Sequence, residues 1–471
     1  YLIWIGPYTE LPSDFWQHLA RIKDEALTIL QNSAVSATGF NGSYAYKLHA
    51  LLTAIFGISQ VELIFPATAF SSIVLLLSFY FFYYWVIYPS IAPQPTASIL
   101  AFVSVIVTFV SFGVDQFSYF RYYALAPTII AFPLFLTGTI TFIEAVRNTH
   151  NRLLNIFFTA VIGLVAGLFH LQELLFLMIF AGVFSVVYFL SQKKQVLPKL
   201  NGLFHHALWL LFPLFFLAPV GLLFFFEAPL PGALDSHFIH LSFLPDELGP
   251  LYLLNPTQQF YGVLGGIGVF AYICFVLLFS RFRNNPYLVT VMIIPIVTVF
   301  NPFFLSFFFH FTSPYHAWRI LYVTPFGLVA VLGGWLFVSR LSSQARKLKI
   351  VALLASIATG ALLLDILTPP RSPLLVRYLT LRPVNGHGLD QTAWPNITQF
   401  LKNLKEPVRI VSDPVTRYFI RGYTQHDAKG FKFHTEYDSV ALNKVFKGGK
   451  AKHLMHPELK GSIFIFNQQD G

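Results

Sequence analysis

Long apolar runs with almost no charge recur through the first 368 residues, and they limit the possible folds more than any other feature. About 20 apolar residues in a row are what an α-helix needs to cross a bilayer. Only 11% of the 471 residues are charged, whereas soluble domains carry roughly 25%. The sequence therefore predicts an integral, multi-pass membrane protein whose main partner is the lipid bilayer, and it disfavours a soluble enzyme.

The expected fold class is an all-α polytopic membrane bundle with about ten transmembrane helices. The opening residues Tyr1–Gly6 are typical of the end of a span, and a helix before residue 1 would bring the number to eleven. The predicted spans are roughly 66–88, 97–113, 123–146, 153–169, 172–191, 206–226, 261–280, 287–309, 320–339 and 350–368.

Basic residues gather on alternate connections between these spans, and this predicts the orientation. The clusters are Arg147 and Arg152; Lys193, Lys194 and Lys199; Arg281 and Arg283; and Arg340, Arg346, Lys347 and Lys349. Cytoplasmic loops carry such an excess of Lys and Arg. The other connections and the polar tail are then extracytoplasmic. The net charge of +10 is accounted for by these loops and the tail, so we expect no nucleic-acid partner.

The tail from residue 369 onward has a different composition from the rest of the chain. Pro369, Pro370 and Pro373 mark the change, and residues 408–413 and 462–466 read as short strands. We therefore predict two parts. Residues 1–368 form a transmembrane module, and residues 369–471 form a small extracytoplasmic α/β domain.

Three ionisable residues near the N-terminus share one face of a predicted interfacial helix near 14–32. Asp14, His18 and Arg21 stand at i, i+4 and i+7, after Ser13 as a candidate N-cap. The opposite face is apolar, so the helix is expected to lie in the membrane interface. Together a carboxylate, an imidazole and a guanidinium can bind a phosphate and supply a base. The alternative is a solvated helix face.

An aromatic cluster with two charges lies in the predicted loop 114–122. Asp115 and Arg121 stand among Tyr119, Tyr122 and other rings. Aromatic platforms with nearby charges commonly bind sugars, so the cluster is a candidate substrate site. The alternative is an interfacial aromatic belt.

Two further groups lie at predicted external ends of spans. His170 and Glu173, at i and i+3, could hold a metal or orient a substrate, unless they only satisfy a turn between two helices. Arg319, with His316 before it, opens a span from outside. Its guanidinium could bind a lipid phosphate or pyrophosphate, and the alternative is a snorkelling arginine.

These features together resemble the GT-C superfamily of integral-membrane glycosyltransferases. Asp14 with His18 and Arg21 resembles the acidic first external loop of that superfamily, while the Asp115 loop and the His170 turn resemble the second and third. The resemblance implies inverting transfer of a sugar from a polyprenyl-phosphate donor to an acceptor at the external surface. Some members need a divalent metal, Mg²⁺ or Mn²⁺, and others do not.

The resemblance also implies roles for the candidate residues. Asp14 would be the catalytic base supported by His18, and Arg21, Arg121 and Arg319 would bind the donor phosphate. Asp115, Tyr119, Tyr122 and His316 would bind substrate, and Asp115, His170 and Glu173 would hold a metal if one is used. The sequence leaves two other classes open, a lipid or glycan transporter or flippase and a non-catalytic membrane assembly protein. A transporter would place ionisable groups near span midpoints, whereas here they gather at one end.

Overall fold

The computed structural model is mostly helical and divides into two compact units. The first contains residues 1–72, 123–129 and 379–471, and the second contains residues 73–122 and 130–378. The predicted domain boundary at residue 368 lies outside the described residues. The structure describes residues 13–30, 43–60, 62–111, 126–148, 150–196, 238–240, 251–254, 264–311, 317–339, 394–404, 408–412, 420, 424, 427–430 and 463–465.

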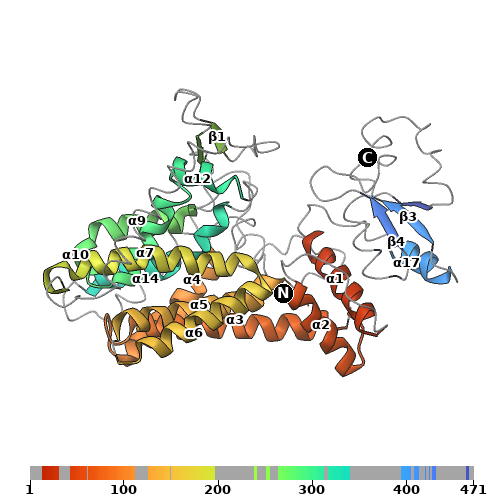
Figure 1. Ribbon diagram of the computed structural model, residues 1–471, viewed down its shortest axis with the longest axis horizontal. Helices are drawn as coiled ribbons and strands as arrows, with labels where there is room; N and C mark the ends of the chain where they lie inside the picture. Colours follow the sequence, from red (N-terminus) through yellow and green to blue (C-terminus); the bar gives the residue numbers. More distant parts are fainter. Residues whose placement is uncertain are drawn as a thin grey trace. The chain divides into compact units, whose positions relative to one another are not determined.

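Four helices of the described part are long and apolar enough to cross a membrane. They are α3 (Ile64–Ile87), α5 (Pro127–Arg147), α6 (Arg152–Phe169) and α7 (Leu171–Val196), coloured orange to yellow in Figure 1. Each coincides with a predicted span. The multi-pass membrane character of the chain is thus supported by its structure as well as by its composition.

Three shorter apolar helices overlap further predicted spans. They are α4 (Gln94–Ser111), α9 (Gly265–Leu277), which is followed by the short α10 (Phe279–Phe282), and α14 (Phe326–Ser339). The prediction of one continuous helix over 320–339 is wrong at its start. Residues Trp318–Val323 form the 3₁₀ helix η6, and the α-helix begins after Pro325. Proline has no N–H for a preceding helix and disfavours helical backbone before it, so the two segments separate there.

The predicted span 287–309 is broken rather than straight. Helices α11 (Pro286–Val297) and α12 (Pro302–Phe308) meet at an angle of 74° and make a fifth candidate span only if counted together. Each begins with a proline after an asparagine, Asn285 or Asn301, whose side chain accepts two backbone N–H groups. This capping starts a new helix in the middle of the apolar run. The predicted spans 206–226 and 350–368 lie outside the described residues, so the total of about ten stays a prediction.

Glycines allow close helix packing inside the second unit. A Cβ on Gly333 of α14 would lie 2.4 Å from the Cβ of Cys274 on α9, and one on Gly327 would lie 2.6 Å from the backbone nitrogen of Thr108 on α4. Such small-residue contacts are typical of helix pairs in membranes. Apolar side chains of α6, including Leu153 and Leu164, are exposed instead, as suits a surface in contact with lipid.

The first unit combines two N-terminal helices with the described C-terminal elements. Helices α1 (Ser13–Leu30) and α2 (Ser43–Phe56) pack together, with Leu19 and Ile22 of α1 buried. Helix α17 (Trp394–Asn403) precedes β3 (Arg409–Ser412), which pairs in parallel with both β4 (Asp427–Gly430) and β5 (Ile463–Ile465). Strands β3 and β5 overlap the segments predicted as strands. A separate α/β domain over 369–471 stays a prediction.

A short hairpin completes the described elements of the second unit. Strand β1 (Phe238–His240) pairs antiparallel with β2 (Tyr252–Leu254), and both fall within a predicted external connection. The backbone N–H of Tyr252 donates to the hydroxyl of Ser306 on α12 at 3.1 Å. The hairpin is therefore attached to the second half of the broken span.

Candidate functional site

The best-defined polar cluster lies at the junction of α6 and α7, where the helical backbone is interrupted. His170 follows the last residue of α6 with extended dihedrals, φ −158° and ψ 115°, and its N–H still bonds to the carbonyl of Ala166. Helix α7 starts immediately at Leu171, so Glu173 stands in its first turn. A carboxylate there is favoured by the positive end of the helix dipole.

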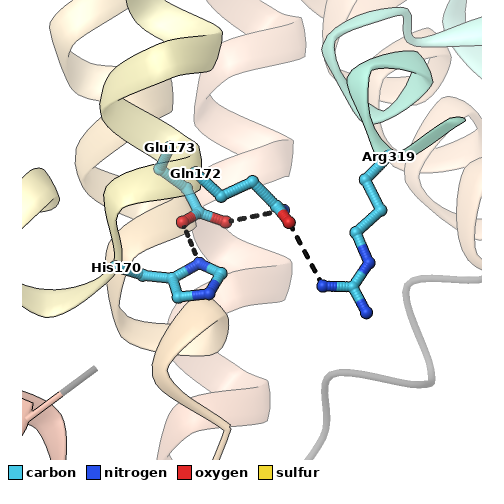
Figure 2. Close-up of polar contacts among 4 residues, drawn as sticks. All are labelled: His170, Gln172, Glu173 and Arg319. Carbon is cyan, nitrogen blue, oxygen red and sulfur yellow. Dashed lines mark hydrogen bonds and ion pairs between the residues drawn. The ribbon is translucent and has the colours of Figure 1, made fainter. Parts of the chain in front are cut away.

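His170 and Glu173 contact each other directly, as Figure 2 shows. The imidazole Nδ1 lies 2.5 Å from Oε2 of Glu173, whose side chain is 0% exposed, while that of His170 is 14% exposed. A buried carboxylate needs a partner to offset its lost hydration. The two residues grouped by the i, i+3 spacing therefore contact each other inside the protein, with the acid as the buried member, and such a contact fits both an orienting role and a satisfied turn.

Arg319 reaches the same cluster through the side chain of Gln172. Its Nη1 donates to Oε1 of Gln172 at 3.3 Å, and Nε2 of Gln172 donates to Oε1 of Glu173 at 3.5 Å. Arg319 comes from η6, 147 residues along the chain from Gln172. The structure thus brings together three sequence-predicted residues, His170, Glu173 and Arg319, within one unit (Figure 2).

A metal ligand set is not formed by the residues that the structure describes. Among them no three His, Cys, Asp or Glu side chains are grouped so as to hold an ion. Asp115, the third predicted ligand, lies outside the described residues. Within the pair, Nδ1 of His170 faces Oε2 of Glu173, and carboxylates take this orienting role toward histidines in metal and catalytic sites.

A second histidine–arginine cluster lies between α1 and α2. The Nδ1 of His18 is 2.8 Å from the hydroxyl oxygen of Tyr46, and Nη1 of Arg21 donates to the same oxygen at 3.4 Å. The Arg21 guanidinium also lies 5.5 Å from the centroid of the Tyr46 ring, in cation–π range. His18 and Arg21 therefore share one face of α1, as their spacing predicts.

Asp14, the predicted base, lies in the first turn of α1, but its side chain is outside the described residues. The same holds for the predicted substrate and phosphate residues of two loops. Those residues are Asp115, Tyr119, Arg121, Tyr122 and His316. Their roles stay predictions.

Two residues of these clusters have no role in the predicted site. Tyr46 joins His18 to Arg21, and Gln172 joins Glu173 to Arg319. Gln172 stands between His170 and Glu173 in the sequence, so a polar triplet at a helix start was a usable signal. Tyr46 lies in a stretch with many aromatic residues and has no distinguishing pattern.

Two more polar contacts belong to the first unit. His49 on α2 is 3% exposed, and burial lowers its pKa from 6.5, although its Nδ1 lies 2.8 Å from the carbonyl oxygen of Ala45. The ammonium of Lys23 on α1 donates to the backbone carbonyl of Thr424. This second contact connects α1 with the C-terminal segment.

The chain matches no protein-family model, no curated protein and no solved structure. Two chemical capacities follow from the geometry itself. At the start of α7, a buried carboxylate orients an imidazole, and a guanidinium is held by a neutral amide beside them. On α1, an imidazole and a guanidinium are held by one phenol. Both arrangements suit the binding of an anion and the transfer of a proton.

Proposed function

We propose that this protein is a membrane glycosyltransferase. It moves a sugar from a polyprenyl-phosphate donor to the hydroxyl of a lipid, glycan or protein acceptor at the extracytoplasmic face, with inversion at the anomeric carbon. The observation that carries the proposal is the cluster of His170, Glu173 and Arg319 where apolar, membrane-capable helices begin. A donor with a long apolar chain and a phosphate needs both lipid access and cations at such a helix end.

The chemistry assigns complementary roles to the acids and the cations. The acceptor oxygen forms a bond to the anomeric carbon, while the bond from that carbon to the phosphate oxygen breaks and its electron pair leaves with the phosphate. Asp14 takes the acceptor proton, supported by His18. Arg21, Arg121 and Arg319 stabilise the charge on the departing phosphate.

The remaining candidates bind substrate or metal in this proposal. Asp115, Tyr119, Tyr122 and His316 contact the sugar or the acceptor. Should transfer require Mg²⁺ or Mn²⁺, Asp115 and His170 are the candidate ligands, with Glu173 as ligand or as orienting group. The geometry of His170 and Glu173 favours the orienting role.

The direct test is transfer from labelled polyprenyl-phosphate sugars by the protein in proteoliposomes, comparing wild type with Asp14→Asn. We expect the variant to lose roughly 100-fold or more in rate, the usual effect of removing a general base. Asp24→Asn removes the same charge from the same helix and serves as the matched control. Full activity of Asp14→Asn removes Asp14 as the base, and no turnover by wild type with any donor refutes the transferase.

A transporter or flippase is the second candidate, and the break between α11 and α12 favours it. Discontinuous apolar helices form substrate sites in many transporters, and this one bends by 74°. The same proteoliposomes decide between the two. Movement of a fluorescent polyprenyl-phosphate lipid between leaflets without any chemical change supports transport, whereas a glycosylated product supports the transferase.

A further inference from the structure

The amide of Gln172 can be oriented in only one way between its two neighbours. An ionised carboxylate only accepts hydrogen bonds, and a guanidinium only donates them. Gln172 must therefore present its NH₂ group to Glu173 and its oxygen to Arg319, as the contacts show.

This arrangement connects the guanidinium to Glu173 through the amide of Gln172. A direct Arg319–Glu173 ion pair would compensate the positive charge that a phosphate needs. The neutral amide instead connects Arg319 to the buried side chain of Glu173, whose other oxygen contacts His170. The side chain of Glu173 thereby positions the imidazole of His170 directly and the guanidinium of Arg319 through Gln172.

The geometry points to Gln172 as a positioning residue for Arg319 in binding the phosphate of a lipid-linked ligand. The assignment rests on the proposed function for the identity of the ligand. Gln172 acts only through Arg319, and Glu173 anchors it. The class of ligand is a phosphate ester on an apolar chain, the diester of the donor or the monoester that transfer releases, because the cluster lies where apolar helices begin.

The lengths of the two contacts set the expected size of the effect. At 3.3 Å and 3.5 Å both exceed the usual 2.7–3.2 Å range for N–H···O bonds. Each is therefore a weak bond, and losing both should matter less than losing the guanidinium. The effect of a Gln172 variant should also vanish once Arg319 is absent.

The test is a binding measurement on the full-length protein in detergent, using farnesyl phosphate as the probe and farnesol as its phosphate-free counterpart. We expect Arg319→Ala to raise the Kd for farnesyl phosphate about tenfold or more and Gln172→Leu to raise it about fivefold. The double variant should stay within about twofold of Arg319→Ala alone, because the two residues act as one unit. Gln192→Leu, further along α7, is the matched control and should bind like wild type.

Binding of farnesol distinguishes a loss of Arg319 positioning from a general structural effect of the substitution. Its affinity should be the same in wild type and in all the variants, since it has no phosphate. Equal loss of farnesol binding in Gln172→Leu, or multiplicative effects of the two substitutions, overturns the role of Gln172. Gln172→Asn, which keeps the amide but shortens the arm, should fall between wild type and Gln172→Leu.

Failure of the positioning role of Gln172 can be distinguished from failure of the proposed glycosyltransferase activity. If sugar transfer occurs but Gln172→Leu binds farnesyl phosphate normally, only the positioning role is refuted. If the binding pattern appears but no donor is turned over, the phosphate site and its positioning residue stand, and the transferase is refuted.

Discussion

Two clusters of the described residues contain a histidine and an arginine, and they differ in the side chains that join the two. At the start of α7, His170 is joined to Arg319 through Glu173 and Gln172, and the connecting carboxylate is completely buried. Between α1 and α2, His18 and Arg21 meet at one uncharged hydroxyl, that of Tyr46, and Arg21 is exposed.

This difference shows how burial changes the energetic cost of losing a partner in a cluster of histidine and arginine. A buried carboxylate has no water to hydrate it and depends on its protein partners. Removing any member of the α7 cluster should therefore cost a large part of the free energy of unfolding. The α1 cluster remains partly hydrated, and water can replace a lost partner there. Substitutions in the first cluster should therefore lower the free energy of unfolding more than substitutions in the second.

The largest effect is expected from removing the buried acid. Glu173→Leu should destabilise the protein by about 3 kcal/mol, because it leaves His170 and Gln172 without the group that holds them. Thermal unfolding in detergent measures this loss. Glu173→Gln keeps the shape and should cost less. A fall in stability of Glu173→Leu no larger than that of Tyr46→Phe would contradict the distinction between the clusters.

The second expected effect compares the two arginines. Arg319→Ala should raise the KM for the donor by about 10-fold to 100-fold, since it removes a held charge from the phosphate. Arg21→Ala should have a smaller effect, because an exposed cation in water is screened. Initial rates at varied donor and fixed acceptor measure both. The opposite ranking would place the main phosphate contact on α1.

A third substitution tests the link in the α1 cluster. Tyr46→Phe removes only the hydroxyl that contacts His18 and Arg21, and should cost about 1 kcal/mol of stability. Tyr44→Phe, on an exposed tyrosine of the same helix, should be neutral. Chemical unfolding of the two variants makes the comparison, and equal stability would mean that the shared hydroxyl contributes nothing.

The last prediction is a pH dependence of the stability of the α1–α2 pair. Since burial holds the pKa of His49 below 6.5, the unfolded chain binds a proton more readily than the folded one. Stability is then complete above pH 6.5 and declines as the pH falls below it, by at most about 1.4 kcal/mol per pH unit.

Hydrogen exchange of α2, corrected for its intrinsic pH dependence, measures this decline. His49→Gln should flatten the decline, whereas His150→Gln, at an exposed histidine, should leave it unchanged. A wild-type profile that does not change from pH 8 to pH 5 would show that His49 does not titrate differently on unfolding.

The sequence by itself determined which segments are membrane-capable helices and which polar residues share a helix face. Helices α3, α5, α6 and α7 overlap the predicted spans because apolar length is a local property, although α7 continues past the predicted end at residue 191 through Lys193 and Lys194. The same is true of the contact between His170 and Glu173, because residues three apart along a helix start are neighbours.

Only the tertiary structure decided where long apolar runs break and which distant residues meet. Asn301 and Pro302 are a local signal for the start of α12, but the 74° angle between α11 and α12 is a property of the folded chain. The meeting of Gln172 with Arg319 joins residues 147 positions apart. The packing of α7 against η6 brings these side chains together, and no local pattern of apolar and polar residues encodes such packing.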